Sequence, residues 1–163
     1  MRVAVIADTH MPRGTRRLPD ACVERLRAAD LVLHGGDVTG IAFWEELCAL
    51  GPPIEGVRGN MDDPAVAARL PEERVVEAAG VRIGMVHVPG ASVGREERLA
   101  RRFADCAAVV YGHTHVPHVG RTDGVWILNP GSPTERRRAP RRTMLELWID
   151  RDEVVPEFVD LRP

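Results

Sequence analysis

The stretch RVAVIADTH, residues 2–10, is an apolar β-branched run that ends directly in Asp8 and His10. The run predicts a buried strand over residues 2–7. The stretches LVLHGGD (31–37) and IEGVRGN (54–60) repeat this pattern, an apolar run followed by polar residues. The two intervals between them have helical apolar spacing, at 19–29 and 41–50. The alternation predicts a βαβαβ unit of parallel strands, and sites in such sheets form at the carboxyl ends of the strands.

The second half of the chain reads differently, with strands that are joined by short turns. RVVEAAGVRIGMVHV (74–88) predicts two strands and a tight turn at Ala79 and Gly80. No internal repeat or long linker divides the chain, so we expect a single domain over residues 1–163. The other predicted elements are a helix at 96–104, a strand at 107–112, and hairpins at 118–132 and 143–161 with turns near Asp123, Gly124 and Asp152.

Composition limits the classes of partner that the chain can have. Its 163 residues are 44% hydrophobic, which is enough for a core, and the net charge of −2 gives no global attraction to nucleic acid or membrane. No apolar stretch approaches membrane-spanning length, so we expect a cytoplasmic protein. Cys22, Cys48 and Cys106 are widely separated, which indicates neither a disulfide framework nor a thiolate zinc site.

Polar residues follow five of the predicted strands and would meet at one edge of the fold. Asp8 and His10 are two residues apart, as are His113 and His115, so in extended backbone each pair would project from one face. Nitrogen and oxygen ligands without thiolate suit manganese, iron or zinc, and seven are too many for one ion. They suit two ions that share one carboxylate. The candidate ligands are Asp8, His10, Asp37, Asn60, His87, His113 and His115.

These motifs resemble an ordered set found in a known family. DTH (8–10), GGD (35–37), GN (59–60) with Asp62, His87 and GHTH (112–115) are similar to the motifs of the calcineurin-like metallophosphoesterases. The spacing, together with NPGSP (129–133), resembles the small prokaryotic YfcE-type phosphodiesterase branch. The resemblance implies an α/β fold, a four-layer αββα sandwich of two mixed β-sheets flanked by helices.

The same resemblance implies a dinuclear centre and a role for each ligand. The first ion would be held by Asp8, His10, Asp37 and His115, and the second by Asp37, Asn60, His87 and His113. Manganese is the expected metal, with iron, zinc and nickel as alternatives. Asp37 would bridge the ions, while Asn60 and His87 would also orient the phosphate. Two such ions acidify a shared water, and the bridging hydroxide attacks phosphorus in line.

The expected activity is therefore that of a phosphodiesterase acting on a small molecule or nucleotide. One alternative is a non-catalytic scaffold, because the retromer scaffold subunit resembles this fold with a degenerate site; here all seven ligand positions are filled. The other alternative is a small metal-dependent nuclease, but the chain has no broad basic face. We expect neither membrane association nor a stable nucleic-acid complex, and the sequence leaves a homo-oligomer open.

Two positions depart from the family pattern. Met61 stands after GN, where many members have a His that can protonate the leaving oxygen, and Pro89 replaces the second His of a THGH element. A site without a general acid should favour leaving groups that depart easily, because proton donation contributes roughly 10² to 10⁴ in rate. Phosphodiesters with phenolic leaving groups are thus expected to be better substrates than alkyl monoesters.

Other polar residues have simpler structural interpretations. We expect His34 to be a packed, hydrogen-bonded core residue and His118 to be exposed at the start of a hairpin. Asn129 and Ser132 should shape the turn in which they lie. The arginines of residues 12–17 and 135–142 favour a solvated face, with substrate contact by the second run as the alternative.

Overall fold

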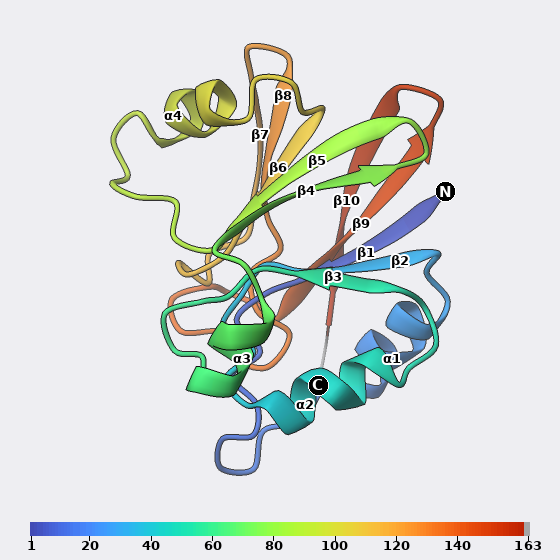
Figure 1. Cartoon of the computed structure of the whole chain (residues 1–163), viewed down its shortest axis with the longest axis vertical. Helices are drawn as coiled ribbons and strands as arrows, with labels where there is room; N and C mark the ends of the chain where they lie inside the picture. The colour runs from blue at the N-terminus through green and yellow to red at the C-terminus, as the bar shows by residue number, and fades with distance from the viewer. Residues whose placement is uncertain (162–163) are drawn as a thin grey trace.

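Two five-stranded sheets make up the computed structural model, which describes residues 1–161 (Figure 1). The first sheet has the order β10-β9-β1-β2-β3, with β1, β2 and β3 parallel and β9 antiparallel to both of its neighbours. The parallel trio confirms the predicted βαβαβ unit. The strands of this sheet are β1 (Arg2–Ile6), β2 (Leu31–His34), β3 (Ile54–Gly56), β9 (Thr143–Asp150) and β10 (Glu153–Asp160).

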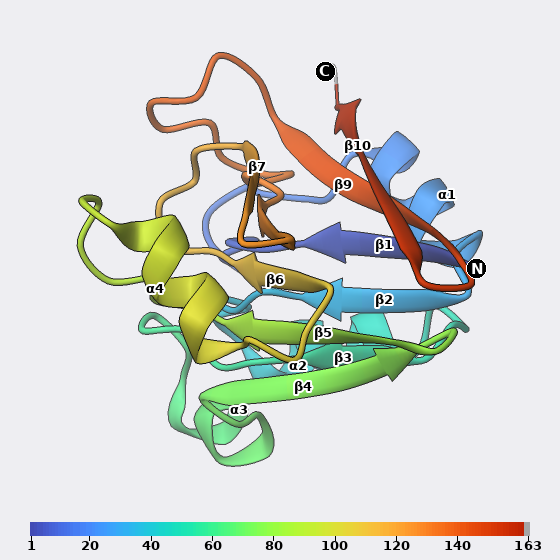
Figure 2. The ribbon, with the colours of Figure 1, turned by 90° about the horizontal axis from the view of Figure 1, so that it is seen from above.

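The second sheet has the order β4-β5-β6-β8-β7, in which β5, β6 and β8 are parallel and the two outer strands run antiparallel to their neighbours. Ala79 and Gly80 form the predicted β4–β5 turn, and both have positive φ. Figure 2 shows β1, β2 and β5 pointing in the same direction, so the two sheets present carboxyl ends to one edge of the molecule. The strands of the second sheet are β4 (Glu73–Ala78), β5 (Val81–Val86), β6 (Ala108–Tyr111), β7 (His118–Thr122) and β8 (Val125–Asn129).

Helices cover the outer face of each sheet. Apolar side chains of α1 (Asp20–Arg27), α2 (Ile41–Cys48) and α3 (Pro64–Arg69) pack on the first sheet. On the second sheet, α4 (Arg95–Arg102) packs through Leu99. The four-layer sandwich expected from the resemblance is confirmed. Among the described residues no helix is both long and apolar enough to cross a bilayer.

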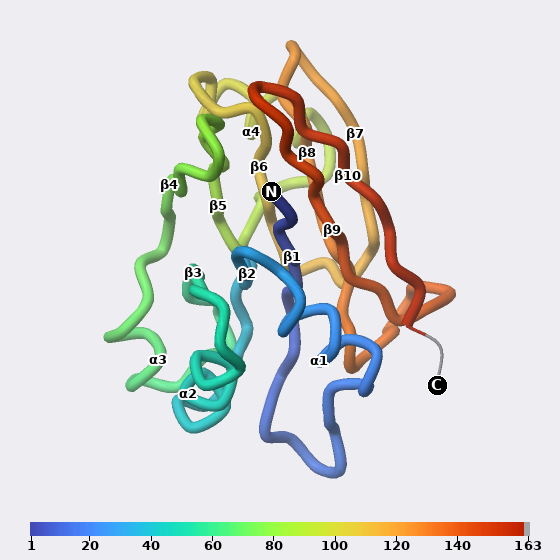
Figure 3. Tube along the Cα trace, turned by 90° about the vertical axis from the view of Figure 1, so that its right-hand side faces the viewer, coloured from blue at the N-terminus to red at the C-terminus, as the bar shows by residue number. Residues whose placement is uncertain are grey.

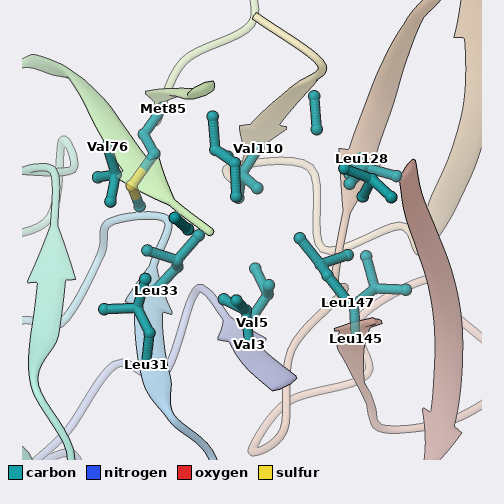
Figure 4. Close-up of a cluster of buried hydrophobic side chains, with 14 of the residues drawn as sticks. Val3, Val5, Leu31, Leu33, Val76, Met85, Val110, Leu128, Leu145 and Leu147 are labelled. Carbon is teal, nitrogen blue, oxygen red and sulfur yellow. The ribbon is translucent and has the colours of Figure 1, made fainter. Parts of the chain in front are cut away.

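The main core lies between the two sheets, where aliphatic side chains from both inner faces interdigitate (Figure 4). Each buried aliphatic side chain contributes about 1.5–3 kcal/mol relative to exposure, so this layer fixes how the sheets face each other. The residues at the common edge of the two sheets are therefore carried by sheets that are packed against each other. Fully buried members include Val3, Val5, Leu33, Leu145 and Leu147 of the first sheet and Ile83, Met85, Ala108, Val110 and Leu128 of the second.

Two features of the fold were not part of the sequence expectations. The six-residue helix α3 was not predicted, although Asp63 accepts a hydrogen bond from Val66 N–H as its N-cap and Pro64 begins it. The C-terminal hairpin β9–β10 pairs with β1, with Arg2 opposite Trp148, whereas the hairpin β7–β8 belongs to the other sheet (Figure 3).

Candidate metal centre

Five loops that follow strands bring the predicted ligands together. The loops follow β1, β2, β3, β5 and β6, so three come from the first sheet and two from the second. Five of the ligands have left-handed backbone, with φ between 48° and 68°. The expectation that the Asp-x-His and His-x-His pairs lie in extended backbone was wrong, because both members of each pair have positive φ. Left-handed backbone destabilises the fold by about 1 kcal/mol for each residue other than glycine. Backbone strain of this kind is concentrated at functional sites. The five are Asp8, His10, Asp37, His113 and His115.

The first cluster consists of Asp8, His10 and His115, which are all fully buried. Their ligand atoms lie within 4.8 Å of one another. The Nε2 atoms of His10 and His115 are 3.1 Å apart, and His115 Nε2 is 3.3 Å from Asp8 Oδ1. Asp8 Oδ2 is buried and has no hydrogen-bond partner within residues 1–161. A divalent cation bound among these atoms would satisfy both the imidazole lone pairs and the carboxylate.

The second cluster consists of Asp8, Asp37 and His87. Asp37 Oδ2 lies 3.2 Å from His87 Nε2 and 3.6 Å from His10 Nε2, so its carboxylate stands between the two clusters. Asn60 Oδ1 is 3.2 Å from His87 Nε2 and 2.8 Å from His113 Nδ1. The structure therefore brings all seven predicted residues together. Asp8 belongs to both clusters, and Asp37 belongs to the second but also lies close to His10 of the first.

The electrostatics of these groups match a cation-binding centre. Burial, with the nearby charge of Asp37 as a further cause, raises the pKa of Asp8 to about 7 against the lowering effect of His87. Burial and then the charge of Arg137 lower the pKa of His115 to about 4, so this imidazole is neutral near pH 7. Buried carboxylates and neutral imidazoles are the donor set that borderline divalent ions prefer. The residues present thus fit a pair of such ions.

The pKa values of His87 and Asp37 shift in opposite directions. Burial lowers the pKa of His87, but its hydrogen bond to Asp37 and the charge of Asp8 outweigh burial and raise it. Burial raises the pKa of Asp37, but the bond to His87 and the Met61 N–H bond to Oδ1 outweigh burial and lower it. Each residue of the pair therefore favours the charged form of the other.

Asn129 and Ser132 shape their own turn as predicted, since Asn129 Oδ1 accepts from Gly131 N–H and Ser132 Oγ accepts from Glu135 N–H. The NPGSP segment also supports the ligand loops, which was not predicted. Ser132 Oγ donates to the Asp8 carbonyl at 2.8 Å, and Thr134 Oγ1 donates to the Thr9 carbonyl at 2.8 Å. Asn129 Nδ2 donates to the Gly112 carbonyl at 3.1 Å, directly before His113. These side chains hold two ligand loops in place from within the protein.

Asp62 joins two other loops, a role that the sequence motif alone did not reveal. Its Oδ1 accepts a hydrogen bond from Thr39 N–H and its Oδ2 accepts one from Gly59 N–H, both at 2.6 Å. The bonds tie the loop after β2, which carries Asp37, to the loop after β3, which carries Asn60. Both carboxylate oxygens are thereby engaged, which fixes the separation of two ligands.

His34 is confirmed as a hydrogen-bonded core histidine. It is fully buried, its Nδ1 accepts from Gly36 N–H at 3.2 Å, and its Nε2 contacts Thr9 Oγ1 at 3.0 Å. Because Nδ1 accepts, the proton of the neutral ring is on Nε2, which donates to Thr9. Burial lowers the pKa of His34 to about 3, with the charge of His87 as a further cause.

We expect His34 to make the metal-free protein sensitive to acid. A folded-state pKa of about 3 against an ordinary value of 6.5 means that the unfolded chain binds the extra proton first as pH falls. The stability is present above pH 6.5 and is lost below it, by about 2 kcal/mol between pH 7 and pH 5. Urea unfolding with chelator should show that the His34→Gln variant, whose amide can make the same two bonds, lacks this loss; parallel pH profiles for the two proteins would contradict it.

The remaining histidine and the arginine runs lie at the margins of the centre. His118 begins β7 as expected, but it is half-buried rather than exposed, with Nε2 3.1 Å from Glu96 Oε1. The two arginine runs meet, since Arg16 Nη2 is 2.9 Å from Glu135 Oε1. Arg137 in the second run is close enough for its charge to lower the pKa of His115. A solvated face alone therefore does not describe these runs.

A cleft of about 460 Å³ lies beside Asn60 and His87. Its walls carry apolar side chains and two guanidinium groups, and Arg58 is paired with Glu72 at 3.0 Å. The remaining lining residues are Gly59, Ala67, Val86, Val88 and Arg102.

Comparison with known proteins agrees with this geometry. The family model described as the calcineurin-like phosphoesterase superfamily domain matches residues 1–152. A probable metallophosphoesterase of Methanothermobacter thermautotrophicus is 33% identical over 98% of this chain and 92% of that protein. A Thermotoga maritima protein solved by NMR is 34% identical with a TM-score of 0.76, covering 98% of this chain and 99% of that chain. Zinc-complexed Vps29 from Entamoeba histolytica is 25% identical with a TM-score of 0.78, covering 99% and 100%. The chain belongs to the calcineurin-like phosphoesterase superfamily.

Proposed function

We propose that this protein is a phosphodiesterase that depends on two divalent ions. The observation that carries the proposal is the pair of buried clusters that share Asp8, with the carboxylate of Asp37 between His87 and His10. Further support comes from the relative named a probable metallophosphoesterase and from the similar Vps29 that was solved with zinc. Manganese is our proposed metal, because a donor set of imidazoles, carboxylates and an amide oxygen without thiolate suits it.

The seven residues divide between the two ions. Asp8, His10 and His115 would hold the first, Asn60, His87 and His113 the second, and Asp37 would bridge them. When bound, such ions supply Lewis-acid polarisation of the phosphoryl oxygens and a water of lowered pKa. His87 Nδ1 faces the Gly35 carbonyl at 2.8 Å, so in the neutral ring Nε2 keeps its lone pair toward the centre.

Asn60 would bind both metal and substrate. Its Oδ1 faces the two imidazoles of His87 and His113, which leaves the Nδ2 donors for a phosphoryl oxygen. The cleft beside it would take one ester group of the substrate. No group at position 61 can donate a proton to the departing oxygen, because Met61 presents a thioether that is 47% exposed.

Met61→His is expected to speed the hydrolysis of poor leaving groups by at least about tenfold, the low end of general-acid gains after discounting for geometry. The Met61 backbone N–H donates to Asp37 Oδ1 at 2.8 Å, which holds position 61 beside the proposed bridge. Good leaving groups should gain little. The measurement is a leaving-group series at fixed manganese and pH, with Met61→Gln as a polar control that cannot titrate. Equal leaving-group slopes in all three proteins would place residue 61 away from the departing oxygen.

The proposed function is tested on the wild-type chain. Protein purified without chelator is analysed for metal and assayed with bis(p-nitrophenyl) phosphate and p-nitrophenyl phosphate in added manganese. We expect two ions per chain and faster hydrolysis of the diester. Two bound ions with no turnover of any diester would favour the scaffold alternative, which the similarity to Vps29 brings forward.

A further inference from the structure

The carboxylate of Glu135 lies close to side-chain nitrogen atoms of three residues. Its Oε2 is 4.0 Å from His115 Nδ1 and 3.5 Å from Arg137 Nε, and its Oε1 is 2.9 Å from Arg16 Nη2. The Glu135 backbone N–H donates to Ser132 Oγ at 3.0 Å. Because the same hydroxyl donates to the Asp8 carbonyl, the backbone of Glu135 is fixed relative to the first cluster.

Two buried atoms of this group have no partner at hydrogen-bond distance and angle within the described chain, His115 Nδ1 and Glu135 Oε2, although the Glu135 backbone lies close enough to raise the pKa of His115 against the larger effect of burial. Buried polar atoms in native proteins nearly always have a partner, so each such atom needs an explanation. The two face each other at 4.0 Å, and a movement of roughly 1 Å would bring them to hydrogen-bond distance. Arg16 holds Oε1 at 2.9 Å, whereas Oε2 has only the longer contact to Arg137 at 3.5 Å and is the oxygen that faces the imidazole.

We propose that Glu135 is the positioning residue for His115, accepting the Nδ1–H of that ring when its Nε2 binds the first ion. A histidine that binds metal through one nitrogen almost always donates its other N–H to a carboxylate or carbonyl, which fixes the tautomer and the ring orientation. His87 already has such a partner, since its Nδ1 lies 2.8 Å from the Gly35 carbonyl. The proposed contact between Glu135 and His115 therefore supports binding of the first ion and not of the second.

The inference rests on the proposed metal binding and assigns a role that the ligand motifs do not contain. Glu135 follows the NPGSP segment, and 25% of its side chain is exposed, so the carboxylate can move. The contacts of the carboxylate with Arg16 and Arg137 oppose a large displacement. A movement of the Glu135 carboxylate by roughly 1 Å toward His115 is consistent with the partial exposure of the side chain and with the two arginine contacts.

The test is manganese titration by calorimetry of the wild type, Glu135→Gln and Glu135→Ala. Loss of a ligand's carboxylate partner costs about 10- to 100-fold in metal affinity. We expect a loss of that size for one of the two ions in Glu135→Ala, a smaller loss in Glu135→Gln, and none for the other ion. Glu157→Gln, on the edge strand β10, is the matched control and should bind as wild type does. Unfolding in chelator verifies that the variants are folded.

A double-mutant cycle separates positioning from a general structural role. In a His115→Ala background, Glu135→Ala should have no further effect on the affinity of either ion. Equal affinities of wild type and Glu135→Ala for both ions, or a full additional loss in the His115→Ala background, would overturn the inference while leaving the proposed function intact. A wild-type chain that binds no manganese would overturn both. Proton NMR of the manganese-free, zinc-loaded protein should also show a slowly exchanging His115 Nδ1–H that Glu135→Ala lacks.

Discussion

Replacing Asp37 with alanine is expected to lower diester turnover by more than about a thousandfold, which corresponds to about 4 kcal/mol of transition-state stabilisation. The reason is that Asp37 Oδ2 stands between His87 at 3.2 Å and His10 at 3.6 Å, where it would be the bridge between two cations. Two cations roughly 4 Å apart repel each other strongly without a shared anion. Turnover with saturating manganese, together with the number of ions bound, measures the effect.

Asp37→Asn is the matched control for the fold. Asparagine keeps the shape and the Oδ1 acceptor for Met61 N–H, which is 2.8 Å away, but removes the bridging charge. It should therefore lose nearly as much turnover as Asp37→Ala and retain more of the unfolding free energy in chelator. Full activity of either variant with a single bound ion would contradict the two-metal proposal.

The Gly59→Ala variant is expected to lose about 3 kcal/mol of stability and measurable manganese binding at the second cluster. A Cβ at this position would lie 2.1 Å from Asp37 Oδ1 and 2.2 Å from Asp37 N, and backbone atoms cannot move aside as a side chain does. The loops after β2 and β3 would have to separate, which would break the Asp62 contact between them. Urea unfolding in chelator and manganese titration measure the two effects.

A glycine substitution in open surroundings provides the comparison. Gly124 lies in the β7–β8 turn with φ +84°, and a Cβ there would meet no atom within 4 Å. Gly124→Ala therefore costs only the left-handed backbone strain of about 1 kcal/mol and leaves metal binding unchanged. If the two variants lost equal stability and both bound two ions, close packing of the loops would not be what requires glycine at position 59.

Local sequence patterns were sufficient to place the strands and the candidate ligands. The apolar run before Asp8 forms a buried strand because β-branched residues favour strands. The ligands after such strands come together because the carboxyl ends of parallel strands lie at the same edge of the sheet. The resemblance then supplied the sandwich, which the structure confirms. The assignment of ions to ligands stays a prediction.

Other features depend on contacts that the sequence does not display. Nothing local in residues 143–160 indicates that β9 joins the first sheet beside β1, because strand pairing at such separation is decided by packing. Asp62 and Glu135 are ordinary loop carboxylates in the sequence, and only the folded chain shows which donors face them. The helix after Asp63 was recognisable from its cap and Pro64, but it is shorter than the window that periodicity needs.

The pairing of β9 with β1 also sets a requirement for folding, because it joins strands from the two ends of the chain. Strands β4 to β8 form a sheet from one continuous segment, whereas β1 has its second neighbour only when Trp148 reaches Arg2. Closing so long a loop is entropically costly, and folds dominated by distant pairings acquire their native contacts slowly. Until that closure β1 is an edge strand, and the loop that carries Asp8 and His10 extends from a sheet that is still open on one side.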